Sequence, residues 1–432
     1  MELSQQSTSG NATLPTDPLH LGRKIIPGLD GLRGVAILLV LIIHYASFWP
    51  RDSQFSMYLY RTLGICTTGV QLFFVLSGFL ITGILLDSKE TTLHYFRNFY
   101  MRRFLRIFPL YYAAVAIFSI YALALAFGAV RPGQMLGFEN NAALNPHEYL
   151  SYLPWLLTYT SNFWSMIHNE LMHVVGPYWT LAIEEQFYLV WPLLVFFLPR
   201  KAVLWTSIGL VLVSALWWCL AATTAMGYTT IYVATPAQVN ALGAGAMLAV
   251  MMRDPKMRYL MAKLSLPILA ISGVIIVFAL ASIWTSNFDW FSVHPAVTLI
   301  KTTAGSTIEI PGFSSGTVNA LLWTVIALFY AALLSCVLFS GEKRGFLGQV
   351  MSSGIMTWFG RYSYGIYILH VAVMFTVSDL ISFVGRLTRL SGTTGLPSVR
   401  VLVSLILTCG LAYLSYHLFE KRFLALKRFF PD

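Results

Sequence analysis

Charged residues are scarce in this sequence: they make up 11% of its 432 residues, whereas a soluble domain carries roughly 25%. Hydrophobic residues make up 57%, and the mean hydropathy is +0.69. A chain this apolar cannot keep its whole surface wet, so the composition excludes an ordinary soluble fold and indicates an integral membrane protein. No polar block is long enough for a separate soluble domain, and we expect one membrane domain over residues 25–432.

Cysteine is scarce as well. Four cysteines occur, all within apolar stretches and none in a C-x-x-C pair, which argues against a disulfide framework and a thiolate metal site. We expect no metal, and we interpret the four as small apolar residues: Cys66, Cys219, Cys336 and Cys409. The pattern of a cleavable signal peptide is also missing. Residues 1–24 are polar and are expected to form a mobile cytoplasmic tail.

Apolar runs of spanning length recur along the chain, which predicts an all-α polytopic membrane bundle of about ten transmembrane helices. The expected spans are 34–50, 64–86, 108–129, 180–198, 203–222, 233–252, 264–286, 317–340, 364–385 and 400–420.

The net charge of +10 would suit a nucleic-acid partner, but in a membrane protein basic residues mark the cytoplasmic side. With ten spans and a cytoplasmic N-terminus, 21 of the 28 Lys and Arg residues fall in the inner pieces. This bias favours cytoplasmic N- and C-termini and leaves no need for nucleic acid. The inner pieces are 1–33, 87–107, 199–202, 253–263, 341–363 and 421–432.

Two expected outer loops, 130–179 and 287–316, are long, aromatic and poor in charge. Loops of this length are often lids or binding surfaces, and the alternative is an ordinary connection packed on the lipid headgroups. Within the first loop, the segment 149–164 is aromatic but interrupted by proline. Counting it as a span would spoil the charge bias, so we expect an interfacial or re-entrant piece.

The first span contains an ionisable pair, and such groups cost roughly 2.5–3.5 kcal/mol each on insertion scales. Arg33 and His44 lie eleven residues apart, which puts them on one helix face with a rise of about 16 Å. Arg33 is then expected at the cytoplasmic mouth and His44 near mid-membrane, with Asp30 ahead of the helix as a cap or partner. Neutral imidazole, which apolar surroundings favour, can act as a general base. The alternative is a structural histidine bonded to a neighbouring helix.

Two other clusters of charge are out of place in lipid. Glu184 and Glu185 stand at the outer end of a span and point about 100° apart on a helix, so they cannot share one role. Arg103 and Arg106 lie at i, i+3 on one helix face, and paired guanidinium groups suit phosphate oxygens. A nucleotide-like cytosolic cofactor is the functional interpretation of the arginines. The alternatives are carboxylates that snorkel to the headgroups and a basic membrane anchor.

A late span carries Ser363, Tyr364 and His370 in the segment GRYSYGIYILH at 360–370. These side chains could line a shared cavity, or they could bond neighbouring helices to one another.

These segments, in this order, resemble the acyltransferase-3 family of integral membrane O-acyltransferases. The resemblance covers nearly the whole chain past residue 24, and six segments in register are specific where one would be weak. They read PGLDGLRGVAILLVLIIH at 27–44, GVQLFFVLSGFLITGILL at 69–86, FYMRRFLRIFPLYY at 99–112, WTLAIEEQFYLVWPLL at 179–194, SYGIYILH at 363–370 and FEKRF at 419–423.

The resemblance implies a ten-helix fold in the bacterial inner membrane and transfer of an acyl group, often acetyl, from coenzyme A. The acceptor would be a hydroxyl of an extracytoplasmic glycan, a glycolipid or a small molecule. Carried onto this sequence, the implied roles are catalysis by His44, Glu184 and Glu185, acyl-CoA binding by Arg33, Arg103 and Arg106, and acceptor contact or cavity lining by Trp179, Tyr188, Tyr364 and His370.

The sequence departs from the family pattern in places. Gln238 and Asn240 stand where the family often shows an arginine and an aspartate, which puts any charge pair there in doubt. We expect a stand-alone form, without an esterase-like domain after the membrane domain. Two other classes compete with an enzyme: a proton-coupled transporter, which usually shows internal repeats that we do not find, and a non-catalytic scaffold or sensor.

Overall fold

The computed structural model describes residues 27–49, 52–89, 93–128, 146–172, 174–221, 223–224, 226–285, 297–301, 307–311, 315–340, 345–387 and 397–431. The expected tail at 1–24 lies outside these residues, as do parts of both long loops.

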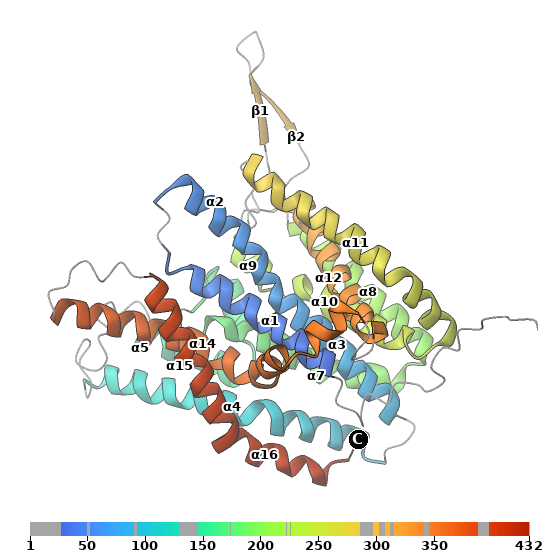
Figure 1. The fold of residues 1–432 in the computed structure, drawn as a ribbon, viewed down its shortest axis with the longest axis horizontal. Coiled ribbons are helices and arrows are strands. Elements are labelled where there is room, and N and C mark those ends of the chain that lie inside the picture. The colour runs from blue at the N-terminus through green and yellow to red at the C-terminus, as the bar shows by residue number, and fades with distance from the viewer. Residues whose placement is uncertain are drawn as a thin grey trace, which may run out of the picture.

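The described chain is a bundle of helices with one small β-hairpin (Figure 1). The elements are α1 (Pro27–Ala46), α2 (Gln54–Leu63), η1 (Gly64–Thr68), α3 (Gly69–Ser88), α4 (Tyr95–Ala126), α5 (Pro146–Leu157), α6 (Ser161–His168), η2 (Gly176–Tyr178), α7 (Trp179–Phe197), α8 (Arg200–Ala221), α9 (Tyr228–Tyr232), α10 (Thr235–Met251), α11 (Pro255–Thr285), β1 (Val297–Lys301), β2 (Thr307–Pro311), α12 (Ser315–Ser340), α13 (Phe346–Met351), α14 (Gly354–Leu387), α15 (Pro397–Ser415), η4 (Tyr416–Glu420), α16 (Lys421–Ala425) and η5 (Leu426–Phe429).

Ten helices in the described residues are long and apolar enough to cross a membrane, which confirms the predicted number and order. The antiparallel pair β1–β2 lies within the expected outer loop 287–316 and stands out beyond α11 in Figure 1. The four cysteines are free thiols in apolar surroundings.

The bounds of the first span differ from the prediction of 34–50. Helix α1 begins at Pro27 and ends at Ala46, so His44 lies in its last turn and not near its middle. Asp30 does not precede the helix either. It lies in the first turn, where its Oδ1 accepts a hydrogen bond of 2.5 Å from Nη1 of Arg33. This ion pair compensates two charges locally, and polar residues can therefore extend the helix beyond its apolar run.

Close helix packing fixes the centre of the bundle. Helix α10 is buried between α3 and α8, and α1 packs along α14. A methyl group added at Gly78 of α3 would lie 2.0 Å from the carbonyl oxygen of Leu242 on α10. Glycine lets these backbones approach closely, as in other membrane bundles.

The segment 149–164 forms a hairpin of two short helices, α5 and α6, whose turn lies against the middle of α4. The hydroxyl groups of Tyr111 and Tyr112 on α4 donate to the carbonyl oxygens of Leu156 and Leu157, each at 2.9 Å. At the turn, the Tyr159 ring stacks on that of Tyr111 at 4.3 Å. The turn of the hairpin is therefore packed against α4, and the choice between an interfacial and a re-entrant piece stays a prediction.

Candidate active site

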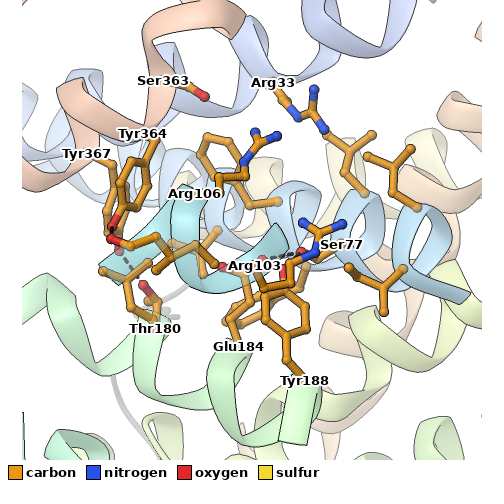
Figure 2. Close-up of a pocket in the computed structure, with 18 residues that line it drawn as sticks. Arg33, Ser77, Arg103, Arg106, Thr180, Glu184, Tyr188, Ser363, Tyr364 and Tyr367 are labelled. Carbon is orange, nitrogen blue, oxygen red and sulfur yellow. Dashed lines mark hydrogen bonds between the residues drawn. The ribbon is translucent and has the colours of Figure 1, made fainter. Parts of the chain in front are cut away.

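A cavity of about 110 Å³ lies where α1, α3, α4, α7 and α14 meet. These five helices carry five of the six segments on which the family resemblance rests. Much of its wall is apolar, and Figure 2 shows its polar side chains. They are Arg33, Ser77, Arg103, Arg106, Thr180, Glu184, Tyr188, Ser363, Tyr364 and Tyr367.

Three arginines from two helices give the cavity its positive charge. Arg33 comes from α1 and is paired with Asp30, while Arg103 and Arg106 come from one face of α4. The Arg103 guanidinium lies over the Tyr188 ring, 5.5 Å from its centroid. Within the described chain, neither Arg103 nor Arg106 forms an ion pair. Their fixed positive charge suits an anionic ligand such as a phosphate group.

Opposite the arginines, Glu184 is held by two hydroxyl groups. The hydroxyls of Ser77 on α3 and Tyr188, one turn further along α7, both donate to its Oε1, as the dashed lines in Figure 2 show. The same two hydroxyl oxygens lie 2.5 Å apart. This cluster fixes the carboxylate at the cavity wall, where its negative charge is close to Arg103.

Tyr367 is a wall residue of the cavity and is held by two hydrogen bonds. The Tyr367 hydroxyl lies 2.6 Å from that of Thr180 and donates to the carbonyl oxygen of Pro177 at 2.9 Å. Its ring also packs beside His370, with 5.5 Å between the ring centroids. Tyr367 therefore contacts the cavity on one side and a histidine on the other.

His44 and His370 form a pair beyond Tyr367, with their rings edge to face and 4.8 Å between centroids. The Nδ1 atom of His44 lies 2.8 Å from the carbonyl oxygen of Val40, and that of His370 lies 2.7 Å from the carbonyl oxygen of Tyr367. A carbonyl can only accept, so each Nδ1 carries the hydrogen and each neutral ring keeps its lone pair on Nε2. The His370 Nε2 is buried and has no hydrogen-bond partner among the described residues.

Glu185 points elsewhere from Glu184, as the 100° step predicts. It does not line the cavity, and its Oε1 is buried without a hydrogen-bond partner in the described chain. Its neighbour along the helix, Gln186, donates to the carbonyl oxygen of Tyr159 at 3.1 Å. Glu185 therefore lies beside the turn of the α5–α6 hairpin.

Six of the ten residues singled out from the sequence line the same cavity: Arg33, Arg103, Arg106, Glu184, Tyr188 and Tyr364. The structure keeps the other four outside it, with Trp179 packed on Tyr232 at 5.2 Å between ring centroids. Sequence reasoning missed Ser77, Thr180 and Tyr367. Each stands within a quoted segment, but hydroxyl groups are common in membrane helices and gave no signal of their own.

Gln238 and Asn240, where the family often carries charge, are fully buried and bond neighbouring elements. Gln238 accepts from Nε2 of Gln71 at 2.5 Å and donates to the carbonyl oxygen of Tyr232 at 2.6 Å. Asn240 donates to the carbonyl oxygen of Trp323 at 3.0 Å. These amides join α10 to α3, α9 and α12, so the departure from the family pattern replaces charge with neutral interhelical bonds.

One protein family matches most of the chain. The acyltransferase-3 family model, described as an acyltransferase domain, matches residues 26–417. The chain belongs to this family. No solved structure matches it.

The family includes named relatives. The chain is 26% identical over 370 residues to the peptidoglycan O-acetyltransferase OatA of Listeria monocytogenes, covering 82% of this chain and 50% of that protein. It is 28% identical over 414 residues to YrhL of Bacillus subtilis, whose name assigns it the same activity, covering 92% and 55%. The chain thus spans about half the length of these relatives.

Proposed function

We propose that this chain transfers an acyl group, acetyl in the first instance, from a cytosolic acyl-CoA to a hydroxyl of an extracytoplasmic glycan. The observation that carries the proposal is the convergence of three arginines, a clamped carboxylate and apolar walls on one cavity, with two histidines beyond its end. The peptidoglycan named for the relatives supports a cell-wall glycan as acceptor. A bacterial inner membrane, with both termini on the cytosolic side, is part of this proposal.

The donor end is assigned to the arginines. Arg103 and Arg106, with Arg33, would bind the phosphates of coenzyme A, because guanidinium groups match phosphate oxygens in geometry and charge. The apolar wall would take the pantetheine arm, which carries the thioester along the cavity toward Tyr367. Along α1, His44 lies about 16 Å from Arg33, which offsets the base from the donor's charged end.

His44 is assigned as the general base. Its Nε2 removes the proton from the acceptor hydroxyl, and the oxygen attacks the thioester carbonyl carbon. A new C–O bond forms and the C–S bond breaks. The proton held on His44 then passes to the departing sulfur, so the products are the ester and free coenzyme A. His370 faces the same imidazole and fixes its position. Glu184 holds Ser77 and Tyr188 at the cavity wall beside the thioester path.

Purified protein in lipid nanodiscs, given radiolabelled acetyl-CoA and a soluble peptidoglycan disaccharide, tests this assignment. His44→Ala is expected to lower kcat by about 10²–10⁴-fold, the usual contribution of a general base. His44→Gln keeps a hydrogen-bond donor for the Val40 carbonyl and should fail equally. Wild-type turnover in both variants would remove His44 from the mechanism.

His168 provides a matched control. Its Nδ1 also contacts a carbonyl oxygen four residues back, that of Trp164 at 2.9 Å, but it is exposed and does not line the cavity. His168→Ala should therefore keep kcat.

The arginine assignment has its own test. Arg103→Ala is expected to raise the KM for acetyl-CoA by about 10-fold or more, because a hydrogen bond to a charged group contributes about 1.5–3 kcal/mol. The exposed Arg200 is the control, and Arg200→Ala should leave that KM unchanged. An unaltered KM in Arg103→Ala would exclude a phosphate contact. Proton-driven uptake without any release of coenzyme A would instead favour a transporter.

A further inference from the structure

The turn of the α5–α6 hairpin contains a tyrosine, Tyr159, with an unusual backbone conformation. Tyr159 has φ +53, in the left-handed region that residues other than glycine rarely adopt. Strained backbone of this kind persists only where the surroundings fix it, and it clusters at functional sites. Here the surroundings are clear: the Gln186 amide donates to the Tyr159 carbonyl oxygen, and the same amide donates to Oδ1 of Asn162 at 2.9 Å.

The Tyr159 ring is held as firmly as its backbone. It stacks on Tyr111 at 4.3 Å and on Phe108 at 5.3 Å, and it meets the Tyr112 ring edge to face at 5.9 Å. Only 6% of the residue is exposed. Three aromatic contacts therefore fix where the phenol hydroxyl points.

That hydroxyl has no hydrogen-bond partner within the described chain, although it is buried. Leaving a buried polar group unpaired costs about 1–3 kcal/mol, so a ligand that accepts a hydrogen bond from this hydroxyl would recover that free energy. Burial, followed by the neighbouring Tyr364 and Glu185, raises the pKa of Tyr159 well above its ordinary value. The phenol therefore stays protonated and can donate a hydrogen bond.

Glu185 supplies the complementary group. Its buried Oε1 is also unpaired, and Gln186, the next residue on α7, is the one that holds the Tyr159 backbone. Tyr364 adjoins this pair and also lines the donor cavity, where its own hydroxyl donates to the Ile107 carbonyl oxygen at 2.5 Å. The unpaired phenol and the unpaired carboxylate thus lie behind one wall residue of the cavity.

We propose that Tyr159 and Glu185 form the binding site for the hydroxyl groups of the acceptor. A hydroxyl both donates and accepts, so one sugar hydroxyl can accept from the phenol and donate to the carboxylate, and a neighbouring hydroxyl can take the remaining positions. The chemical class is a polyhydroxylated acceptor, such as a sugar, presented by the α5–α6 hairpin. This inference rests on the proposed transfer to a glycan, and it assigns to Tyr159 a role that the motifs of the sequence did not indicate.

The test is equilibrium binding to the full chain in nanodiscs. The probe is a soluble disaccharide of N-acetylglucosamine and N-acetylmuramic acid. Tyr159→Phe keeps the ring stack and removes only an oxygen that has no hydrogen-bond partner among the residues the structure describes. We expect it to raise the Kd of the disaccharide at least fivefold while the KM for acetyl-CoA stays unchanged, and the thermal unfolding temperature should stay the same or rise because an unpaired buried hydroxyl is removed.

Tyr152→Phe is the matched control in the same hairpin. Tyr152 is fully buried like Tyr159, but its hydroxyl donates to the carbonyl oxygen of Ser161 at 3.5 Å. Its removal should leave the Kd of the disaccharide unchanged. A purely structural role of the hairpin would predict equal effects of the two variants.

Two results would overturn the inference: a Kd within twofold of wild type in Tyr159→Phe, or no binding of the disaccharide by the wild-type protein. Acetyl-CoA turnover by the same preparation separates these failures from failure of the proposed function. Release of coenzyme A to another hydroxyl acceptor would keep the acyltransferase and reject the disaccharide site, whereas absence of any release would reject acyl transfer itself.

Discussion

Helix α1 crosses α14 at Gly360, and this crossing offers a test of how the fold positions the site. A methyl group added to Gly360 would lie 1.8 Å from the carbonyl oxygen of Asp30 and 2.6 Å from its carbonyl carbon. Comfortable carbon–oxygen contacts need about 3.3 Å or more. The obstructing atoms belong to the α1 backbone and cannot rotate away, so Gly360→Ala must push the two helices apart by about 1.5 Å.

The expected losses of stability and of activity follow from the tight contact and from the site residues on α1 and α14. Overpacking of a tight contact destabilises by about 1–3 kcal/mol. The effect on activity should be larger, because α1 bears Arg33 and His44 while α14 bears Tyr367 and His370. A misplacement of about 1 Å can cost about 10²-fold in rate. Gly360→Ala should therefore lower acyl transfer by about two orders of magnitude in protein that still folds.

The assay combines thermal unfolding in detergent, followed by tryptophan fluorescence, with acetyl transfer from labelled acetyl-CoA. Gly410→Ala on α15 is the control, because nothing lies within 4 Å of the added methyl there. That variant should be neutral or more stable by up to about 1 kcal/mol, since alanine favours the helix over glycine. Wild-type stability and turnover in Gly360→Ala would refute the argument that this crossing fixes the site.

The remaining predictions concern contacts that hold the bundle. Arg253 donates two hydrogen bonds to Asp87, at 2.7 and 2.6 Å, and two more to backbone carbonyl oxygens. Arg253→Ala should therefore destabilise the protein by about 1–3 kcal/mol, measured as a lower unfolding temperature. An unchanged unfolding temperature would show that the pair contributes nothing to stability. Gln186 joins the α5–α6 hairpin to α7 and accepts a hydrogen bond from Thr235 at 2.7 Å. Gln186→Ala should lower the free energy of unfolding by about 1–3 kcal/mol and also weaken disaccharide binding. Wild-type binding in a destabilised variant would contradict the link between Gln186 and Tyr159.

The membrane fold could be predicted from the sequence because lipid imposes a strong constraint. Each span must be an apolar helix of minimum length, so composition and run length suffice to count ten of them. The ends of the helices could not be predicted in this way. Hydropathy assigns polar residues to the outside of a span, whereas Asp30 and Arg33 pair with each other inside the first two turns of α1. Hydropathy scores each residue separately, so it cannot predict that a local ion pair lets two charged residues lie within a helix.

The cavity residues that could be predicted from the sequence are those whose side chains are costly to place in lipid. Glu184 stood out because a charge within a span needs a compensating reason. Arg103 and Arg106 stood out because two guanidinium groups on one helix face suit phosphate oxygens. Ser77 and Tyr367 did not stand out, since a hydroxyl can satisfy itself on its own helix and costs little. Their importance depends on which helices are neighbours, and that information is absent from any single span.

The hairpin shows the same limit in a different way. Its proline and polar residues argued against a full span, and two short helices are found there, but the sequence could not show which helix the turn would contact. That contact is made by Tyr111 and Tyr112 of α4, whose hydroxyls donate to the carbonyl groups of Leu156 and Leu157. A non-helical turn can lie inside a bundle when other side chains satisfy its backbone.

The separation of the donor cavity from the histidine pair has a consequence for the proposed reaction. Tyr364, Tyr367 and His370 follow one another at i, i+3 on one face of α14, over a rise of about 9 Å. Tyr367 lines the cavity, and its ring packs beside His370 of the histidine pair. A thioester must come within about 3–3.5 Å of the attacking oxygen. In the proposed mechanism, donor and acceptor would therefore meet beside Tyr367, whose hydrogen bonds to Thr180 and Pro177 hold its ring between the cavity and His370.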